Sequence, residues 1–174
     1  TARAGNVIGG GDWAEDRLIP DLVRSLSSGN ALRIRNPQAT RPWQHVLGPL
    51  SGYLRIGQVL LDGGVEPDAW NLGPAATDTR TVGDIISRLQ GHWPKLRVEL
   101  DAGPHPHESP YLALDCHKAE QELDWRPVWS ADTALLHTAR WYEVFQDDGR
   151  VTTCDDLAAY AQAAREAGAC WAAF

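Results

Sequence analysis

Apolar residues recur at helical spacing in several segments of the chain, and shorter apolar runs lie between these segments. The helical spacing spans residues 18–26, 47–61, 82–89 and 135–145, and it also predicts short or terminal helices at 116–123 and 154–167. The shorter runs predict strands at residues 1–8, 32–34, 69–72 and 96–100. Residues 43–46 fit either a further strand or the lead into the next helix.

Residues that start and stop helices support these boundaries. Pro20 lies near the start of the first helical segment and Gly29 follows its end. Thr81 and Asp84 have the spacing of a capping box, and Ser130 is placed to cap the helix after it. Strands and helices therefore alternate, which predicts a mixed α/β fold without internal repeats.

Composition narrows the class of protein. The chain has 174 residues, of which 43% are hydrophobic and 22% charged, as expected for a globular domain with a core. Its formal net charge is -7 and it has no Lys/Arg-rich block, so the sequence predicts neither a nucleic-acid nor a membrane partner. Three widely spaced cysteines fit reduced thiols in a cytoplasmic protein. The chain has no methionine, so we expect it to be part of a longer protein.

The stretch Gly9–Ala14 reads as G-x-G-x-x-A, which is the pattern of a dinucleotide-binding turn. Such a turn opens directly into a helix and has an acidic residue about 20 positions later. Here the helix begins only near Arg17, the GNALRIR segment has no acid, and Asp12 puts negative charge where a pyrophosphate would lie. We therefore expect the glycines to allow a close approach to a neighbour or ligand instead.

Five motifs occur in order along the first 145 residues. They are RAGNVIGGGD, RLIP, RPWQHV, WNLG and LDCHK followed by LDWRP. This series resembles the C-terminal half of the extended short-chain dehydrogenase/reductases that act on nucleotide sugars. Within these enzymes, the sequences of the segments are most similar to the CDP-glucose 4,6-dehydratase family.

The resemblance implies an α/β fold made of an incomplete Rossmann fold and a small mixed lobe. It implies a nucleotide-sugar-binding lobe over residues 1–150, with the last part of a Rossmann sheet, and a C-terminal helix and tail over 151–174. The first strand would then have an exposed edge, which predicts self-association of this chain.

In that family the N-terminal half carries the NAD-binding turn and a Tyr-x-x-x-Lys pair. No tyrosine of this chain has a lysine four positions later. The resemblance therefore implies an NAD-dependent dehydratase, a lyase of deoxysugar biosynthesis, whose catalytic residues and main cofactor motif lie in a missing N-terminal half. It also implies a CDP-sugar substrate and an oligomer, such as a dimer, for the intact enzyme.

The resemblance also implies substrate-binding residues. It places diphosphate contacts on Asn6, Arg17, Arg41 and Asn71, since arginine pairs with phosphate oxygens and asparagine adds a neutral donor. Arg35 belongs to a short strand expected along the nucleotide base. His107 and Glu108 are candidates for sugar hydroxyls, although the family's usual arginine is absent from their loop. Each of these residues also fits a simpler role as a surface charge or a loop cap.

Other functions stay open from sequence alone. The HPHE segment has too few ligands for zinc, so no metal site is predicted. The alternatives are a fragment of another nucleotide-sugar epimerase, dehydratase or reductase, or a lobe that binds a nucleotide sugar without catalysis.

Overall fold

The opening apolar run forms two short strands instead of one. In the computed structural model, which describes residues 1–103 and 109–173, β1 (Ala2–Ala4) pairs in parallel with β6 (Trp70–Leu72), whereas β2 (Asn6–Ile8) pairs in parallel with β5 (Trp43–His45). Gly5 separates the two strands. A Cβ at Gly5 would lie 2.3 Å from the carbonyl oxygen of Pro42, so only glycine fits there. The chain therefore changes its strand partner at Asn6.

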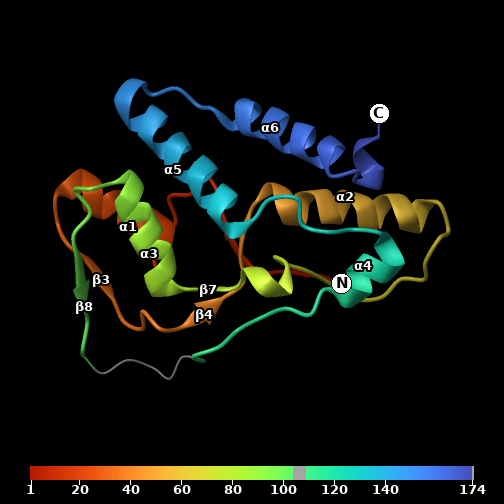
Figure 1. Ribbon diagram of the computed structural model, residues 1–174, viewed down its shortest axis with the longest axis horizontal. Coiled ribbons are helices and arrows are strands. Elements are labelled where there is room, and N and C mark those ends of the chain that lie inside the picture. Colours follow the sequence, from red (N-terminus) through yellow and green to blue (C-terminus); the bar gives the residue numbers. More distant parts are fainter. Residues whose placement is uncertain (104–108, 174) are drawn as a thin grey trace.

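The remaining strands also form pairs. β3 (Leu32–Ile34) runs parallel to β8 (Val98–Leu100), and β4 (Thr40–Arg41) runs antiparallel to β7 (Arg80–Thr81). Figure 1 shows these two pairs below the helices α1, α3 and α5. Within residues 1–103 and 109–173 the strands make four separate two-stranded pairs.

The six predicted helices are all confirmed, with small changes at their ends. They are α1 (Leu18–Ser28), α2 (Leu47–Leu61), α3 (Val82–His92), α4 (His117–Leu123), α5 (Ala131–Asp148) and α6 (Thr153–Glu166). Two 3-10 turns cover Ala76–Asp78 and Cys170–Ala172.

The predicted caps are also present. The Thr81 hydroxyl accepts the Asp84 N–H at 3.0 Å, and the Asp84 carboxylate accepts the Thr81 N–H at 3.1 Å, which completes the capping box of α3. Ser130 accepts the Thr133 N–H at 3.2 Å at the start of α5. Gly29 ends α1 with a φ of 71°, a left-handed conformation that favours glycine.

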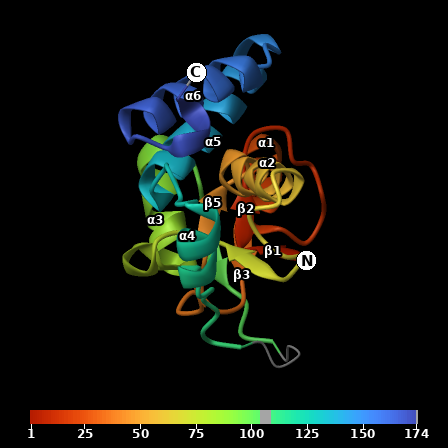
Figure 2. The same cartoon turned by 90° about the vertical axis from the view of Figure 1, so that its right-hand side faces the viewer.

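Two hydrophobic clusters hold these elements together. The larger one joins α1, α3 and α5 to strands β2, β3 and β5, and it includes Leu22, Ile85, Leu89 and Tyr142, all of them fully buried. The smaller cluster joins α2 and α4 to β6 through residues such as Leu72 and Trp125. Figures 1 and 2 show α6 and the C-terminus on the far side of α2 from α4.

The fold class is mixed α/β, as predicted from the alternating pattern. The division into a lobe over 1–150 and a tail over 151–174 stays a prediction. Among the described helices, none is both long and apolar enough to cross a membrane.

Candidate functional site

A cavity of about 990 Å³ opens where β2 passes into the Gly9–Arg17 loop and α1 begins. Its walls also include β3 and the residues after it, Arg41 of β4, Trp43 of β5 and the first residue of α3. Its volume is at the upper end of the range for small-molecule sites, which is about 300–1,000 Å³. The cavity can therefore accommodate a ligand as large as a nucleotide sugar.

Seven of the nineteen described residues that line the cavity are charged. The described residues contribute four guanidinium groups and three carboxylates, from Arg17, Arg33, Arg35, Arg41, Asp12, Asp16 and Asp21. An anion with several oxygen atoms could pair with the guanidinium groups, because each offers a planar set of N–H donors. The carboxylates would oppose such an anion.

Arg41 is the most deeply placed of the four arginines. Its side chain is buried, and its Nη1 donates to the carbonyl oxygens of Thr40 at 2.8 Å and Ser109 at 2.9 Å. These bonds fix the orientation of the guanidinium group and connect β4 to the segment at Ser109. A buried and oriented cation is suited to binding an anion.

Asn6 lies at the point where the chain changes from β1 to β2. Its backbone N–H donates to the Pro42 carbonyl oxygen at 2.8 Å, which fixes the residue at the cavity edge. Asn6 therefore lies at the cavity edge, next to the close approach of Gly5 to Pro42.

Trp43 supplies a buried donor in the same wall. Its side chain is 4% exposed, and its indole Nε1 has no hydrogen-bond partner within the described part of the chain. An unpaired buried donor costs free energy, of the order of 1–3 kcal/mol. Because protein atoms cover this nitrogen, a ligand in the cavity could reach it only if the wall moved.

The glycine-rich loop packs against α5 and does not fit a dinucleotide. A Cβ at Gly10 would lie 2.0 Å from Trp141 Cγ, so glycine is needed for the loop to contact the tryptophan ring. Gly11 has a φ of 80°, and α1 starts only at Leu18. This geometry supports the expectation that the glycines allow a close approach to a neighbour, and it gives no helix N-terminus for a pyrophosphate directly after the loop.

The loop is also anchored by hydrogen bonds. The Tyr142 hydroxyl donates to the Asp12 carbonyl oxygen at 2.6 Å, and the Arg24 guanidinium donates to the carbonyl oxygens of Trp13 and Ala14, each at 3.0 Å. Burial, together with the nearby Asp12 charge, raises the pKa of Tyr142 to about 12, which keeps the phenol a neutral donor.

Over 147 residues the chain is 46% identical to the CDP-glucose 4,6-dehydratase of Salmonella typhimurium, which is 83% of this chain and 41% of that protein. The chain is similar to a CDP-glucose 4,6-dehydratase over most of its own length. It spans less than half the length of this relative. No family model matches it.

Solved structures share the fold. A dTDP-glucose 4,6-dehydratase from Bacillus anthracis, in complex with NAD, matches 85% of this chain and 44% of its own with a TM-score of 0.68 and 22% identity. A UDP-glucose 4-epimerase from Thermotoga maritima, solved with UDP-glucose, matches 84% of this chain and 46% of its own with a TM-score of 0.69 and 18% identity. The chain therefore shares the fold of a part of these two enzymes, over less than half of their length.

Four of the seven residues predicted to bind a CDP-sugar line this cavity. These are Asn6, Arg17, Arg35 and Arg41. They come from four separate segments of the sequence, so the fold brings them together. Their role in binding stays a prediction.

Asn71 is not among the residues that line the cavity. It belongs to β6, opposite Arg3 of β1, and its side-chain amide donates to the Asp115 carbonyl oxygen at 2.9 Å. Its predicted contact with the diphosphate therefore has no support from this cavity. His107 and Glu108, predicted to contact sugar hydroxyls, lie outside the described residues.

Sequence reasoning did not assign Asp12, Asp16 and Trp43 to the ligand cavity. In the sequence, Asp12 is recognisable only as a residue that opposes a cofactor phosphate in the glycine loop. The acidic residues directly after the glycines were an available signal, but their place on one cavity with Arg33 and Arg35 depends on tertiary packing. Within the described ranges, no three His, Cys, Asp or Glu side chains gather as a metal site.

Proposed function

We propose that this chain forms the nucleotide-sugar-binding part of an NAD-dependent CDP-glucose 4,6-dehydratase. The observation that carries the proposal is the cavity in which Asn6, Arg17, Arg35 and Arg41 meet. Its guanidinium groups suit the two phosphates of a CDP-sugar, and its volume suits the whole ligand. The identity of 46% to a CDP-glucose 4,6-dehydratase favours CDP-glucose over other nucleotide sugars.

In this proposal the chain binds and orients the substrate, and the reaction belongs to the complete enzyme. That reaction converts CDP-glucose to CDP-4-keto-6-deoxyglucose and water, a lyase reaction without net oxidation. The glycine loop of this chain does not fit NAD, because Trp141 occupies the space next to Gly10. We therefore assign NAD to the remainder of the enzyme and no catalytic residue to this chain.

Titration of the purified chain by isothermal calorimetry tests the proposal. We expect CDP-glucose and CDP to bind, UDP-glucose to bind less tightly, and NAD not to bind. Arg35→Ala should weaken CDP-glucose binding by about tenfold, the loss expected for one charge-assisted hydrogen bond at an accessible site.

Arg126→Ala is the matched control, because Arg126 does not line the cavity and its side chain is 76% exposed. It should leave the affinity unchanged. Equal affinity for UDP-glucose and CDP-glucose would contradict the CDP assignment. A folded chain that binds no nucleotide sugar would contradict the proposal as a whole.

A further inference from the structure

One arginine of the cavity wall is paired with an acid of the same wall. Arg17 Nη1 lies 3.2 Å from Asp12 Oδ2, and both residues line the cavity. The Arg17 side chain is 64% exposed and the Asp12 side chain 31% exposed. The pair therefore lies at the mouth of the cavity and not in the core.

The two partners differ in how firmly they are held. The Asp12 carbonyl oxygen accepts the Tyr142 hydroxyl at 2.6 Å, and the Asp12 carboxylate accepts the Ala14 N–H at 3.0 Å. The Trp13 ring packs on Tyr142 and Phe145 of α5, with ring centroids 5.4 and 5.7 Å apart. Arg17 precedes α1 and has a long, exposed side chain. Asp12 is thus held by its loop, whereas the exposed Arg17 side chain can reorient once its ion pair with Asp12 is exchanged.

A fixed carboxylate opposes a phosphate in two ways. It is paired with Arg17, so an anionic ligand must replace the Arg17–Asp12 ion pair with its own pair to Arg17. It also repels the negative charge of the ligand at short range. Asp16 lines the same cavity and adds to this repulsion, whereas Asp21, which also lines it, is paired with Arg24. Because Asp12 cannot move away with its loop anchored, its charge remains near the bound ligand.

We infer that Asp12 is a built-in competitor of the anionic ligand for Arg17 and so limits the affinity of the cavity for phosphates. Only a ligand with enough negative charge to outcompete this carboxylate then engages Arg17. In the complete enzyme this competition would favour release of the nucleotide product. The inference rests on the proposed function, since the ligand it regulates is the CDP-sugar diphosphate.

The test measures binding of CDP-glucose and of inorganic pyrophosphate to the whole chain by calorimetry. Asp12→Asn keeps the oxygen that accepts the Ala14 N–H but removes the charge. We expect it to bind both ligands about threefold or more tightly than the wild type, which is the scale of an exposed ion pair. In an Arg17→Ala background the same substitution should give a smaller gain, because the pair no longer exists.

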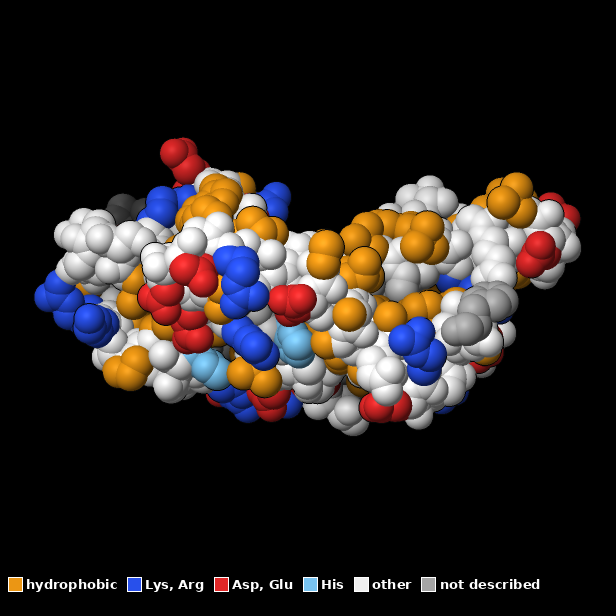
Figure 3. Space-filling model, turned by 90° about the horizontal axis from the view of Figure 1, so that it is seen from above, with side chains coloured by type: hydrophobic (Ala, Val, Ile, Leu, Met, Phe, Trp, Pro, Cys, Tyr) orange, Lys and Arg blue, Asp and Glu red, His pale blue; other side chains and the backbone are white. Residues whose placement is uncertain are grey.

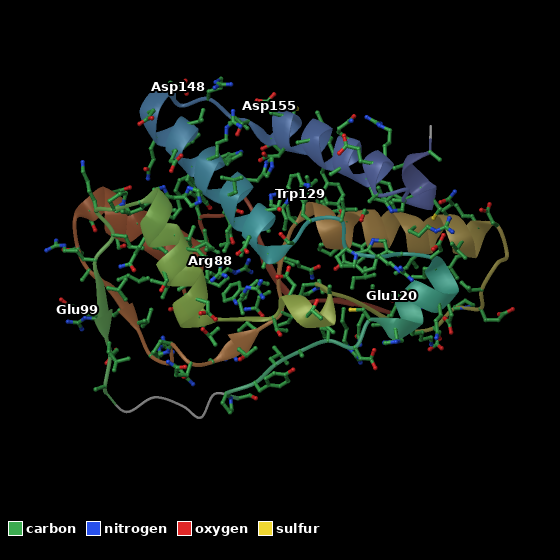
Figure 4. All side chains as sticks on the ribbon, viewed as in Figure 1. Arg88, Glu99, Glu120, Trp129, Asp148 and Asp155 are labelled. Carbon is green, nitrogen blue, oxygen red and sulfur yellow. The ribbon has the colours of Figure 1, made fainter. Side chains whose placement is uncertain are left out.

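Asp155→Asn is the matched control. It removes the same charge from a 74% exposed side chain on α6, which Figure 4 shows at the outer edge of the molecule. It should leave both affinities within the error of the wild type.

The outcomes separate the inference from the proposed function. Unchanged or weaker binding by Asp12→Asn overturns the inference, and so does an equal gain in the Arg17→Ala background. If pyrophosphate binds as described but CDP-glucose does not bind, the competition stands and the proposed function fails. If the folded wild-type chain binds neither ligand, both are wrong.

Discussion

His45 is a buried imidazole in a group of aromatic and polar side chains. Its side chain is 4% exposed, and its Nδ1 accepts the Leu47 N–H at 3.3 Å. Its ring packs edge to face on Trp129, with the two ring centroids 4.9 Å apart. Trp129 in turn stacks on His137, whose Nδ1 lies 2.7 Å from Asp156 Oδ1 on α6. Figure 4 shows Trp129 between α5, α6 and α2. This group connects α2, α5 and α6, so its charge state affects how these three helices pack together.

The charge state of His45 makes the stability of the fold depend on pH. Burial, with a smaller contribution from nearby His137, lowers the pKa of His45 from 6.5 to about 4. The folded protein therefore binds this proton less well than the unfolded chain, and stability falls as the pH drops from 6.5 to 4. From this group alone we expect a free energy of unfolding about 2 kcal/mol lower at pH 5 than at pH 7.

His45→Phe should remove this contribution, since phenylalanine keeps an aromatic ring beside Trp129 and has no proton to bind. Urea denaturation of both proteins at pH 5 and pH 7 measures it. The difference in unfolding free energy between the variant and the wild type should change by about 2 kcal/mol between the two pH values. Carboxyl groups titrate equally in both proteins, so they cancel. A difference that stays constant with pH would show that His45 does not titrate as stated.

At the scale of elements, local sequence predicted the helices well because their signals are local. Apolar spacing located α1 to α6, and the Thr81–Asp84 and Ser130 caps formed where expected. The strand partners were not predictable in the same way. The split of the first strand at Gly5 depends on Pro42, which lies 37 positions later in the sequence. Long-range packing of this kind leaves no periodic signal.

The candidate site follows the same rule. Asn6, Arg17 and Arg41 came from motifs and Arg35 from the strand expected along the base, and the fold places all four on one cavity. Asn71 came from an equally good motif, yet its strand pairs with β1 on the other side of the switch at Gly5. Motifs indicated which residues carry polar chemistry, but strand pairing decided which of them share a wall.

The contact between the glycine loop and α5 leads to a prediction at this scale. Gly10→Ala should destabilise the protein by about 2 kcal/mol, because the new methyl group would overlap the Trp141 ring and force the loop away from α5. Thermal and urea denaturation measure the change.

Gly57→Ala is the matched control with the opposite sign. Gly57 lies inside α2 with open space around its Cβ position, so alanine should stabilise the protein by about 0.5–1 kcal/mol. Equal effects of the two substitutions would show that the contact with Trp141 does not constrain the loop.

At the scale of the whole molecule, one face of α2 is apolar and exposed to solvent. Leu50, Tyr53, Leu54 and Leu61 are 46%, 41%, 78% and 89% exposed, and their spacing places them along one side of the helix. Figure 3 shows hydrophobic side chains gathered over the part of the molecule where α2 and α6 lie. Relatives of this chain are more than twice as long, since it spans 41% of the Salmonella protein. An apolar face of this kind is typical of a surface that is covered by other protein.

The isolated chain should therefore self-associate through this face. Sedimentation velocity over a range of concentrations should show a dimer or larger species, with burial of the leucine side chains as the driving force. Leu54→Glu should shift the distribution toward the monomer, because a carboxylate cannot enter an apolar contact without losing its hydration. Leu54 is 78% exposed, so the substitution leaves the core intact.

Gln121→Glu adds the same charge at an exposed site on α4 and should leave the distribution unchanged. A monomer at all concentrations in the wild type would contradict the role given to α2, and an equal shift in both variants would assign the association to net charge instead.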